Sequence, residues 1–488
     1  MRFISTRGQS PAVLAPEAVL RGIAPDGGLY VPEAWPPLDW QALPEAYPAL
    51  AGAVFARLLP GFAQQTLEDI AQAAYGELFD SPQVAPVISL GKAHVLELFH
   101  GPTAAFKDLA LCVLPRLMVS ARDQLMPGQR ILILTATSGD TGSAAMAGFR
   151  NLPGTRAVVF YPQEGVSPVQ RAQMRRMPGD NLFAFAIRGD FDAAQAGVKL
   201  AFAGAAAAGL PDDLMLSSAN SINIGRLVPQ VVYYISAYKH LVRRGKLAAG
   251  EALHVVVPSG NFGDILAAYL AKRMGLPLGM LVCASNQNRV LTDFITTGLY
   301  DRRRKLHLSL SPSMDILVSS NVERLLHLAT GGDSGYVAGL MQRLKDQGHY
   351  QLPASALAQV QADFMAISAT EEDTQAAIRQ AWEDDRYVLD PHAAVAWHAW
   401  QRLKDQLPQG PVLLAATASP FKFPQAVLSA LGAAPIPDGL VAMGQLAQKT
   451  GLSIPLSLAW LPGAPDIRHQ VIDPADIPAA AFQEARIW

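Results

Sequence analysis

One lysine of this 488-residue chain lies where its amine could act as a nucleophile. Lys107 follows a short apolar run at 94–99, and the residues between them, 99–106, are mostly small or aromatic. Burial in such surroundings lowers the pKa of a lysine, because it disfavours the ammonium ion and leaves a neutral amine. Most lysines instead extend their ammonium group into solvent. The setting of Lys107 therefore indicates a reactive amine, with an ordinary surface lysine as the alternative.

A second candidate is the polar loop at 134–143, between an apolar run at 130–136 and an alanine-rich helix expected at 142–149. The residues that could contact a ligand there are Thr137, Ser138, Gly139, Asp140 and Thr141. Hydroxyl groups and the free N–H groups at a helix N-terminus can bind an anion together. The same residue types also favour an ordinary capped turn, so the loop alone leaves both interpretations open.

A third candidate is the loop at 257–264, which joins an apolar run at 252–258 to a helix expected at 264–274. Its possible ligand contacts are Gly260, Asn261, Phe262, Gly263 and Asp264. The two glycines could form a concave row of backbone N–H groups, an arrangement that binds phosphate. The loop is neither a P-loop nor a dinucleotide fingerprint, because no GxxxxGK[ST] occurs and the glycine spacing does not fit GxGxxG. A turn without a ligand remains the alternative.

The loop at 416–422 follows a further apolar run, at 412–418. Ser419 and Lys422 fit the S-x-x-K pattern of some hydrolases, but Ser236 and Lys239 fit it equally well. A pattern that occurs twice by composition is no evidence for a serine–lysine hydrolase.

The elements that must position these loops are strands alternating with helices. Strand-length apolar runs occur at 94–99, 130–136, 156–161, 181–187, 252–258 and 412–418. All but the first are nearly continuous in hydrophobicity, as expected for strands buried on both faces of a parallel sheet. Helical patterns at 192–206, 221–244 and 264–274 separate them. The alternation predicts βαβ units and an α/β fold, in which ligands bind beyond the carboxyl ends of the strands.

The length of the chain predicts two or three domains. We expect an N-terminal domain at 1–85, a main α/β region at 86–435 and a C-terminal extension at 436–488. Within the main region we expect a smaller subdomain at about 135–245 and a mostly helical insertion at about 286–370.

The composition bounds the function. Half of the residues are hydrophobic and 16% are charged, which suffices for a large core, and the net charge is only −2. This balance indicates no nucleic-acid partner and no membrane surface. The N-terminus lacks the apolar segment of a secretory signal, and the apolar run at 201–210 is too short to cross a bilayer. Cys112 and Cys283 lack metal-ligand spacing, so we expect no metal site and no disulfide scaffold. A cytoplasmic protein is the expectation.

Five segments, taken in order and spacing, resemble the motifs of the threonine synthase family. They are FHGPTAAFKD (99–108), TATSGDTG (135–142), SSANSINIGR (217–226), PSGNFGD (258–264) and TASPFKF (417–423). The likeness is to the long form found in bacteria and fungi, and it extends from PDGGLYVP (25–32) through DPHAAVAW (390–397) to about residue 430. Five motifs in one order are far more specific than any one of them.

The resemblance implies the tryptophan-synthase-β-like fold of pyridoxal-phosphate enzymes, known as fold type II, with an extra N-terminal domain and a helical insertion. It implies pyridoxal 5'-phosphate as the cofactor and O-phospho-L-homoserine as the substrate. The implied reaction yields L-threonine and phosphate by γ-elimination and β-addition of water, the last step of threonine biosynthesis. We expect a monomer or a homodimer.

The resemblance also implies roles for single residues. Lys107 would be the Schiff-base lysine, and Thr417 would hydrogen-bond the pyridine nitrogen. The cofactor phosphate would be seated by Gly260, Asn261, Phe262, Gly263 and Asp264. The loop of Thr137, Ser138, Gly139, Asp140 and Thr141 would bind the substrate carboxylate, and the substrate phosphate would be gripped by Asn220, Ser221 and Arg226.

One motif departs from the family. In TASPFKF the family usually has His at the position of Ser419 and Ala at that of Phe421, which leaves open the shape of the pocket near the ring nitrogen. Two alternatives also remain. A pyridoxal-phosphate dehydratase or phospholyase would share the lysine and the glycine-rich loop, although the SANSIN…R segment favours a phosphorylated substrate with water addition. A non-catalytic homologue would be expected to lack Lys107.

Overall fold

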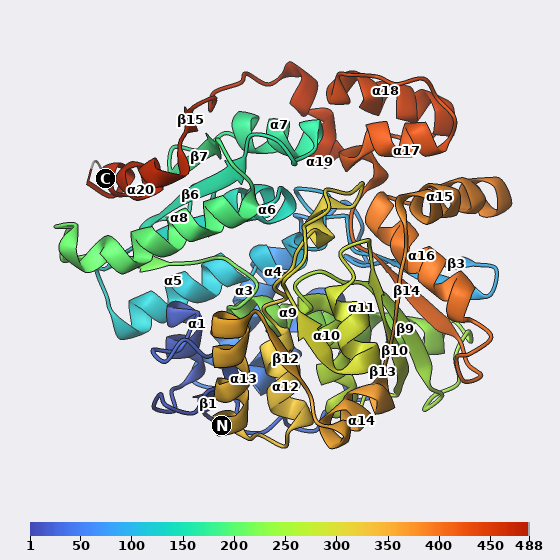
Figure 1. Cartoon of the computed structure of the whole chain (residues 1–488), viewed down its shortest axis with the longest axis horizontal. Coiled ribbons are helices and arrows are strands. Elements are labelled where there is room, and N and C mark those ends of the chain that lie inside the picture. Colours follow the sequence, from blue (N-terminus) through green and yellow to red (C-terminus); the bar gives the residue numbers. More distant parts are fainter. Residues whose placement is uncertain (487–488) are drawn as a thin grey trace.

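The computed structural model describes residues 1–486 and contains two large β-sheets with helices packed on their faces, besides two two-stranded sheets (Figure 1). The larger sheet has the order β13-β10-β9-β14-β4-β3, and its neighbouring strands are parallel except for the antiparallel pair β3 and β4. Its strands are β3 (Val87–Leu90), β4 (Ala93–Glu97), β9 (Leu253–Pro258), β10 (Leu278–Ser285), β13 (Phe364–Ser368) and β14 (Val412–Ala416). This sheet and its helices form the large lobe.

The smaller sheet is parallel throughout, with the order β15-β7-β6-β5-β8. Its strands are β5 (Arg130–Ala136), β6 (Thr155–Pro162), β7 (Leu182–Ile187), β8 (Leu214–Ser217) and β15 (Val471–Ile472). Side chains alternate between its faces: Leu132 and Phe160 belong to one buried cluster, and Ile133 and Val159 to another. Both faces are covered, which explains why these runs are continuously apolar. We call this sheet and its helices the small lobe.

The expected α/β class is therefore confirmed. The apolar runs at 94–99, 130–136, 156–161, 181–187, 252–258 and 412–418 correspond to β4, β5, β6, β7, β9 and β14, each within two residues. The helices that flank the small sheet are α5 (Leu114–Leu125), α6 (Asp140–Phe149), α7 (Pro168–Arg176) and α8 (Phe191–Gly204).

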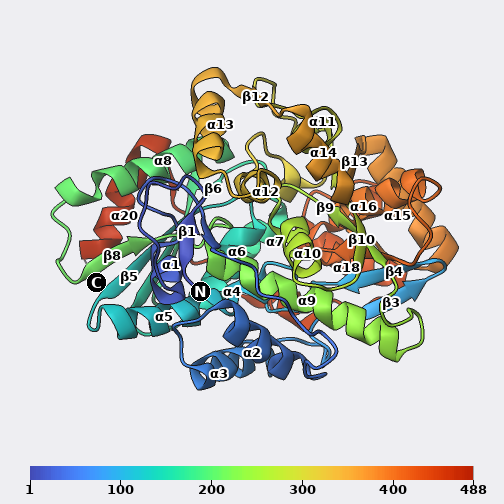
Figure 2. The same ribbon diagram turned by 90° about the horizontal axis from the view of Figure 1, so that it is seen from below.

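The N-terminal segment packs on both lobes. It contains the antiparallel pair β1 (Phe3–Ser5) and β2 (Tyr30–Pro32) and the helices α1 (Ala15–Arg21), α2 (Tyr47–Leu58) and α3 (Gln64–Tyr75). Helix α1 packs on α5, and α2 packs on the long helix α9 (Ile224–Arg243), as Figure 2 shows from below. The buried side chains of this segment belong to the same cluster as those of α5 and α9.

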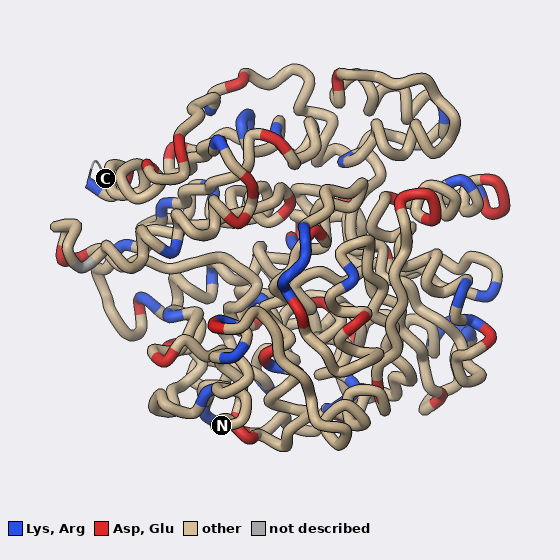
Figure 3. The backbone as a smooth tube through the Cα atoms, viewed as in Figure 1, with Lys and Arg blue, Asp and Glu red and all other residues tan. Residues whose placement is uncertain are grey.

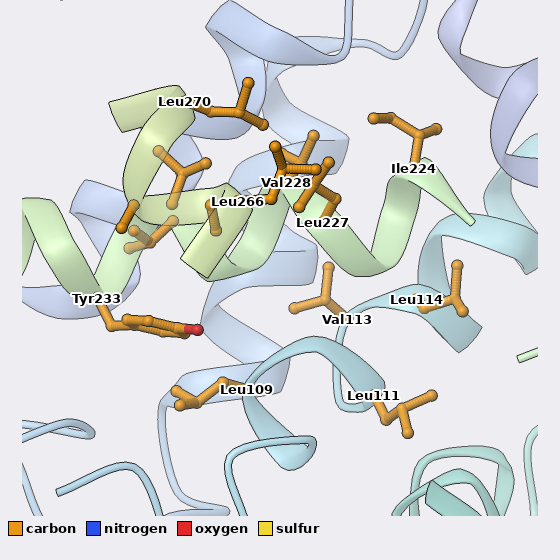
Figure 4. Close-up of a cluster of buried hydrophobic side chains, with 14 of the residues drawn as sticks. Leu109, Leu111, Val113, Leu114, Ile224, Leu227, Val228, Tyr233, Leu266 and Leu270 are labelled. Atoms are coloured by element: carbon orange, nitrogen blue, oxygen red, sulfur yellow. The ribbon is translucent and has the colours of Figure 1, made fainter. Parts of the chain in front are cut away.

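That cluster lies directly behind the lysine loop. It is formed where α4 (Asp108–Leu111) and α5 meet α9 and α10 (Gly263–Arg273), and Figure 4 shows Leu109, Val113, Leu227 and Leu266 from these helices pointing toward one another. All four side chains are inaccessible to solvent. The packing therefore fixes the helix that follows Lys107 against the helix that follows the 257–264 loop.

The segment expected as a helical insertion contains α11 (Val290–Thr297), α12 (Val322–Ala329), α13 (Ser334–Gln347) and α14 (Ala354–Asp363), with a short hairpin of β11 (Leu299–Asp301) and β12 (His349–Gln351). It ends in β13, which joins the edge of the larger sheet beside β10. The sequence analysis did not predict β10 or β13. The segment at 302–321, between β11 and α12, borders the cleft described below.

The C-terminal part links the two lobes. After α15 (Glu371–Asp385) and α16 (Pro391–Leu403) on the large lobe come α17 (Pro424–Ala430), α18 (Gly439–Thr450) and α19 (Leu456–Ala459). The chain then returns along the top of Figure 1 to the small lobe, where β15 pairs with β7 and α20 (Ile477–Arg486) packs on α8. The last two residues of the expected extension, 487–488, lie outside the described residues.

Basic and acidic residues are interspersed along the backbone of both lobes (Figure 3). Within residues 1–486, none of the helices has both the length and the hydropathy needed to cross a membrane.

Candidate active site

Lys107 lies between β4 and α4, in a loop that is bound to the loop after β14. The Phe106 N–H donates to the Thr417 carbonyl at 2.8 Å, and the Ser419 N–H donates to the Ala104 carbonyl at 3.0 Å. The Lys107 side chain is 12% exposed. Burial, as the largest cause, lowers its pKa to about 8. The Lys107 amine is therefore buried and has a lowered pKa, as expected from the sequence.

A narrow pocket joins Lys107 to the 257–264 loop. Its walls include Lys107, Thr417 and the turn at 260–264. Thr417 follows the carboxyl end of β14, and the turn follows the carboxyl end of the neighbouring β9, so adjacent parallel strands bring the two loops together.

The turn at 260–264 presents backbone N–H groups. Phe262 has a left-handed conformation (φ +61°), which is uncommon for a residue with a side chain, and α10 begins immediately after it. The Gly260 carbonyl accepts from the Ser319 hydroxyl at 2.7 Å, and the Asn261 carbonyl accepts from the Asn321 backbone N–H at 3.2 Å. Those carbonyls are thereby engaged by the insertion, while the first turn of α10 keeps N–H groups without helical partners. This arrangement suits a phosphate.

Two buried polar atoms on the wall of this pocket are unpaired. Arg226 Nε and Asp264 Oδ2 have no hydrogen-bond partner among the described residues. Arg226 donates to the Ala219 carbonyl at 2.7 Å, and burial lowers the pKa of its guanidinium to about 10, so it stays cationic at neutral pH. Burial raises the pKa of Asp264 to about 6, although the hydroxyls of Tyr233 and Tyr234 donate to its Oδ1 at 2.5 and 2.6 Å. A buried guanidinium nitrogen without a hydrogen-bond partner costs free energy, and a ligand that accepts a hydrogen bond from it removes that cost.

The narrow pocket adjoins a wide cleft of about 650 Å³ between the lobes. Lys107, Thr141 and Ser221 line both cavities. Thr137, Ser138 and Asn220 line the cleft alone, and Arg226 lines the narrow pocket. Asp140 also lines the narrow pocket, so seven of the eight predicted substrate residues lie around Lys107.

Gly139 lines neither cavity, and Asp140 lines the narrow pocket with its carboxylate already paired. Gly139 has φ +132°, and a Cβ at this position would lie 2.5 Å from the Gln170 side chain, so only glycine fits. The Asp140 carboxylate is already engaged: it accepts from Gln170 Nε2 at 2.7 Å and pairs with Lys422 Nζ at 2.7 Å. A carboxylate so placed does not suit contact with a substrate carboxylate, because the two charges repel each other.

Three residues near the site were not predicted from the sequence. His392 lines the narrow pocket and accepts from the Ser313 N–H at its Nε2 (3.2 Å), so its Nδ1 carries the proton and donates to Asp390 at 2.7 Å. Lys422 is fully buried. His392 lies in the segment DPHAAVAW and Lys422 in TASPFKF, so the match of these segments to the family could have identified both residues. Ser313 lies in the insertion, where no motif was recognised.

The two departures from the family motif are both buried. The Ser419 hydroxyl accepts from the Phe421 N–H at 3.3 Å, which caps a short 3₁₀ turn, and Phe421 is 2% exposed. Among the described residues no cluster of three or more His, Cys, Asp or Glu side chains has the arrangement of a metal site.

Comparison with known proteins defines the class. Residues 83–418 match the family profile described as pyridoxal-phosphate dependent enzyme, so the chain belongs to this class. Residues 2–75 match the profile of the threonine synthase N terminus, and residues 393–451 match the threonine synthase C-terminal profile. The threonine synthase of Pseudomonas aeruginosa is 41% identical over 446 residues, which cover 89% of this chain and 92% of that protein. The chain belongs to the threonine synthase family.

Solved structures agree. The pyridoxal-phosphate-bound threonine synthase of Brucella melitensis has a TM-score of 0.87 at 36% identity and covers all of both chains. The yeast threonine synthase has the same TM-score at 32% identity, over 99% of this chain and 98% of that one. Human threonine synthase-like 1 is 42% identical over 454 residues, or 88% of this chain, but the match spans only 60% of the human protein's length.

Proposed function

We propose that this protein is a threonine synthase that converts O-phospho-L-homoserine and water into L-threonine and phosphate with pyridoxal 5'-phosphate as cofactor. The observation that carries the proposal is the narrow pocket in which a buried lysine, a phosphate-binding turn and a threonine after β14 meet. Its unpaired Arg226 Nε supports an anionic ligand at that position.

Pyridoxal phosphate fits this donor set. The N–H groups of the turn at 260–264 would hold its phosphate, the Thr417 hydroxyl would donate to its ring nitrogen, and Lys107 would bind its aldehyde carbon. When bound, the cofactor supplies an electron sink for charge that develops on the substrate. A neutral hydroxyl at the ring nitrogen does not hold that nitrogen protonated, so the site steers the reaction through Lys107 and the substrate contacts.

Lys107 would then move protons. With substrate bound, the freed Lys107 amine would take a proton from Cα and transfer protons at Cβ. A pKa of about 8 suits both directions, because general acid–base catalysis is most efficient when the pKa lies near the working pH.

The substrate contacts would come from the mouth of the pocket. Thr137, Ser138 and Thr141, with the N–H groups at the start of α6, would bind the substrate carboxylate. Asn220, Ser221 and Arg226 would bind the substrate phosphate, and a guanidinium suits this role because it can donate two parallel hydrogen bonds to a phosphate. The phosphate would leave from Cγ, and water would add at Cβ.

Product analysis tests the proposal. The purified protein with pyridoxal phosphate and O-phospho-L-homoserine should release phosphate and L-threonine in equal amounts. Lys107→Ala should lose both products and the absorbance band of the lysine-bound cofactor, whereas Lys239→Ala, at a buried lysine outside both cavities, should keep them. A 2-oxo acid in place of threonine would instead identify a dehydratase or phospholyase.

The organisation of the chain is also a proposal. We infer an N-terminal domain at 1–85, a catalytic region at 86–435 and a C-terminal extension at 436–488, and a cytoplasmic enzyme that works as a monomer or homodimer. Sedimentation of the purified protein measures the oligomeric state.

A further inference from the structure

A second lysine is buried beside the reactive one. Lys422 follows β14 and has no exposed surface. Its Nζ lies 2.7 Å from Asp140 Oδ1 and donates to the Thr103 carbonyl at 2.9 Å. A buried ammonium is stable only when its charge is paired and its protons are accepted. Both conditions are met here, so Lys422 is a fixed cation within the site.

The carboxylate of Asp140 connects this cation to Lys107. Its Oδ2 lies 3.7 Å from Lys107 Nζ and accepts from the Ser313 hydroxyl at 2.9 Å, while its Oδ1 also accepts from Gln170. The partners come from the large lobe, the insertion and α7 of the small lobe, so the position of the carboxylate is determined from several sides. Arg226, Lys422 and His392 are the nearby cations or potential cations, and Asp264 is the other acid that faces Lys107.

We infer that Lys422 is a positioning residue for the reaction: it neutralises Asp140 and holds that carboxylate against Lys107, so that the Lys107 ammonium can release its proton near neutral pH. The inference deepens the proposed function, because it assigns the residue that prepares the amine which the proposed reaction needs.

The direction of the effect follows from the charges. A lone carboxylate 3.7 Å from Lys107 would stabilise the ammonium form and raise its pKa. With Lys422 in place the carboxylate is paired, and burial, followed by the positive charges of Arg226 and Lys422, lowers the pKa of Lys107 to about 8 although Asp140 still raises it. The loss of the charge at residue 422 should therefore leave Lys107 protonated to a higher pH.

Competitive labelling of the apoprotein tests this inference without measuring turnover. A trace of acetic anhydride acetylates neutral amines, and mass spectrometry of the Lys107 peptide at increasing pH gives the midpoint for that amine. In Lys422→Met the midpoint should rise by about one pH unit, which at neutral pH lowers labelling of Lys107 about tenfold. Lys422→Arg should keep the midpoint of the parent protein, because it retains the charge.

Two further variants separate charge from packing. In the double variant Lys422→Met with Asp140→Asn, both charges are absent and the midpoint should return toward that of the parent. Lys239→Met replaces a buried lysine that donates to the Leu43 carbonyl and pairs with Glu45, outside both cavities, and should leave the midpoint unchanged. An equal shift in Lys422→Met and Lys422→Arg, or no shift in either, would overturn the inference.

The outcome is distinguishable from a failure of the proposed function. Reduction of the holoenzyme with borohydride, followed by peptide mapping, shows whether the cofactor is attached to Lys107. A cofactor on Lys107 together with unshifted labelling would refute only the role of Lys422. A cofactor attached elsewhere would refute the proposed function while the labelling result stood.

Discussion

Asp264 is a buried acid of the site whose pKa is raised. Its Oδ1 accepts from two tyrosine hydroxyls, its Oδ2 is unpaired among the described residues, and burial raises its pKa from 3.8 to about 6. An acid with a raised pKa contributes stability that is fully present below the unfolded pKa and is lost as the pH rises through the folded pKa. Here that window runs from about pH 4 to about pH 6.

We therefore expect Asp264→Asn to change the pH dependence of stability. The amide keeps an oxygen that can accept from Tyr233 and Tyr234 but cannot ionise. Between pH 4 and pH 7 the free energy of unfolding of the parent should fall, relative to the variant, by about 2 kcal/mol. Urea unfolding of the apoproteins at both pH values measures this difference. Asp384→Asn, at an exposed position, is the control, and an equal pH dependence of parent and Asp264→Asn would contradict the prediction.

Thr417 offers a test of the ring-nitrogen contact. Thr417→Asp would place a carboxylate at that contact, which would hold the ring nitrogen protonated and change the electron sink. We expect kcat for threonine formation to fall at least about tenfold, which corresponds to about 1.4 kcal/mol in the barrier. Thr417→Ser keeps the hydroxyl and should retain most of the activity. Steady-state kinetics with O-phospho-L-homoserine measure both variants, and an unchanged kcat in Thr417→Asp would argue against the assigned contact.

Residues of the site differ in how far the sequence could predict them. Lys107, Thr417 and the turn at 260–264 lie in loops directly after apolar runs, so their convergence followed from the parallel sheet. The partners of Lys422 could not be predicted, because Asp140 and Thr103 are far away in the sequence and no pattern links them. The same loop pattern made Asp140 a candidate residue but did not indicate that its carboxylate pairs with Lys422 and Lys107.

At the level of elements, continuous hydrophobicity identified most of the central strands, although not β10, and it missed the edge strands β3, β8, β13 and β15. Strand β13 has only one fully buried residue, Phe364, because it lies at the edge of the larger sheet. Strand β15 has two residues and is defined only by its pairing with β7. Such strands lack a distinct apolar pattern. For this reason the contribution of the C-terminal extension to the small sheet could not be predicted from sequence.

Helix α20 supplies an apolar face to that sheet. Ile477 and Ala481 are fully buried and lie in one cluster with Ala194 and Val198 of α8. Ile477→Ala should therefore lower the free energy of unfolding by about 2–5 kcal/mol, the usual cost of such a truncation in a core. Urea unfolding measures the change, and hydrogen exchange should show the loss of protection in α8.

The same extension provides a matched control. Leu456 is 81% exposed, so Leu456→Ala should change the free energy of unfolding by no more than about 0.5 kcal/mol. Equal effects of the two substitutions would show that α20 does not stabilise the small lobe.

For the whole molecule, the N-terminal segment shares its buried core with the rest of the chain. Its buried residues, including Phe55 and Leu50, belong to the same cluster as those of α5, α9 and α10. The Tyr75 hydroxyl donates to the Leu109 carbonyl in α4 at 2.5 Å, and Arg7 pairs with Glu323 of α12 at 2.9 Å. The predicted boundary at residue 85 therefore falls within a continuous core.

We expect, as a consequence, that a fragment lacking residues 1–82 will not form the active site. The faces of α5 and α9 that α1 and α2 cover would be exposed, and exposed apolar surface of that extent favours aggregation or a loosely packed state. The isolated fragment should lose its near-UV circular dichroism, bind a hydrophobic dye and fail to attach pyridoxal phosphate at Lys107. Co-expression with a fragment of residues 1–82 should restore all three properties, because the buried interface can form between separate chains. Removal of residues 469–488 should instead leave the large lobe folded, since the described part of this segment, 469–486, packs on the small lobe. The prediction would be contradicted by a fragment without residues 1–82 that binds the cofactor as well as the full chain. The core would then divide at residue 83, where the match to the pyridoxal-phosphate enzyme profile begins.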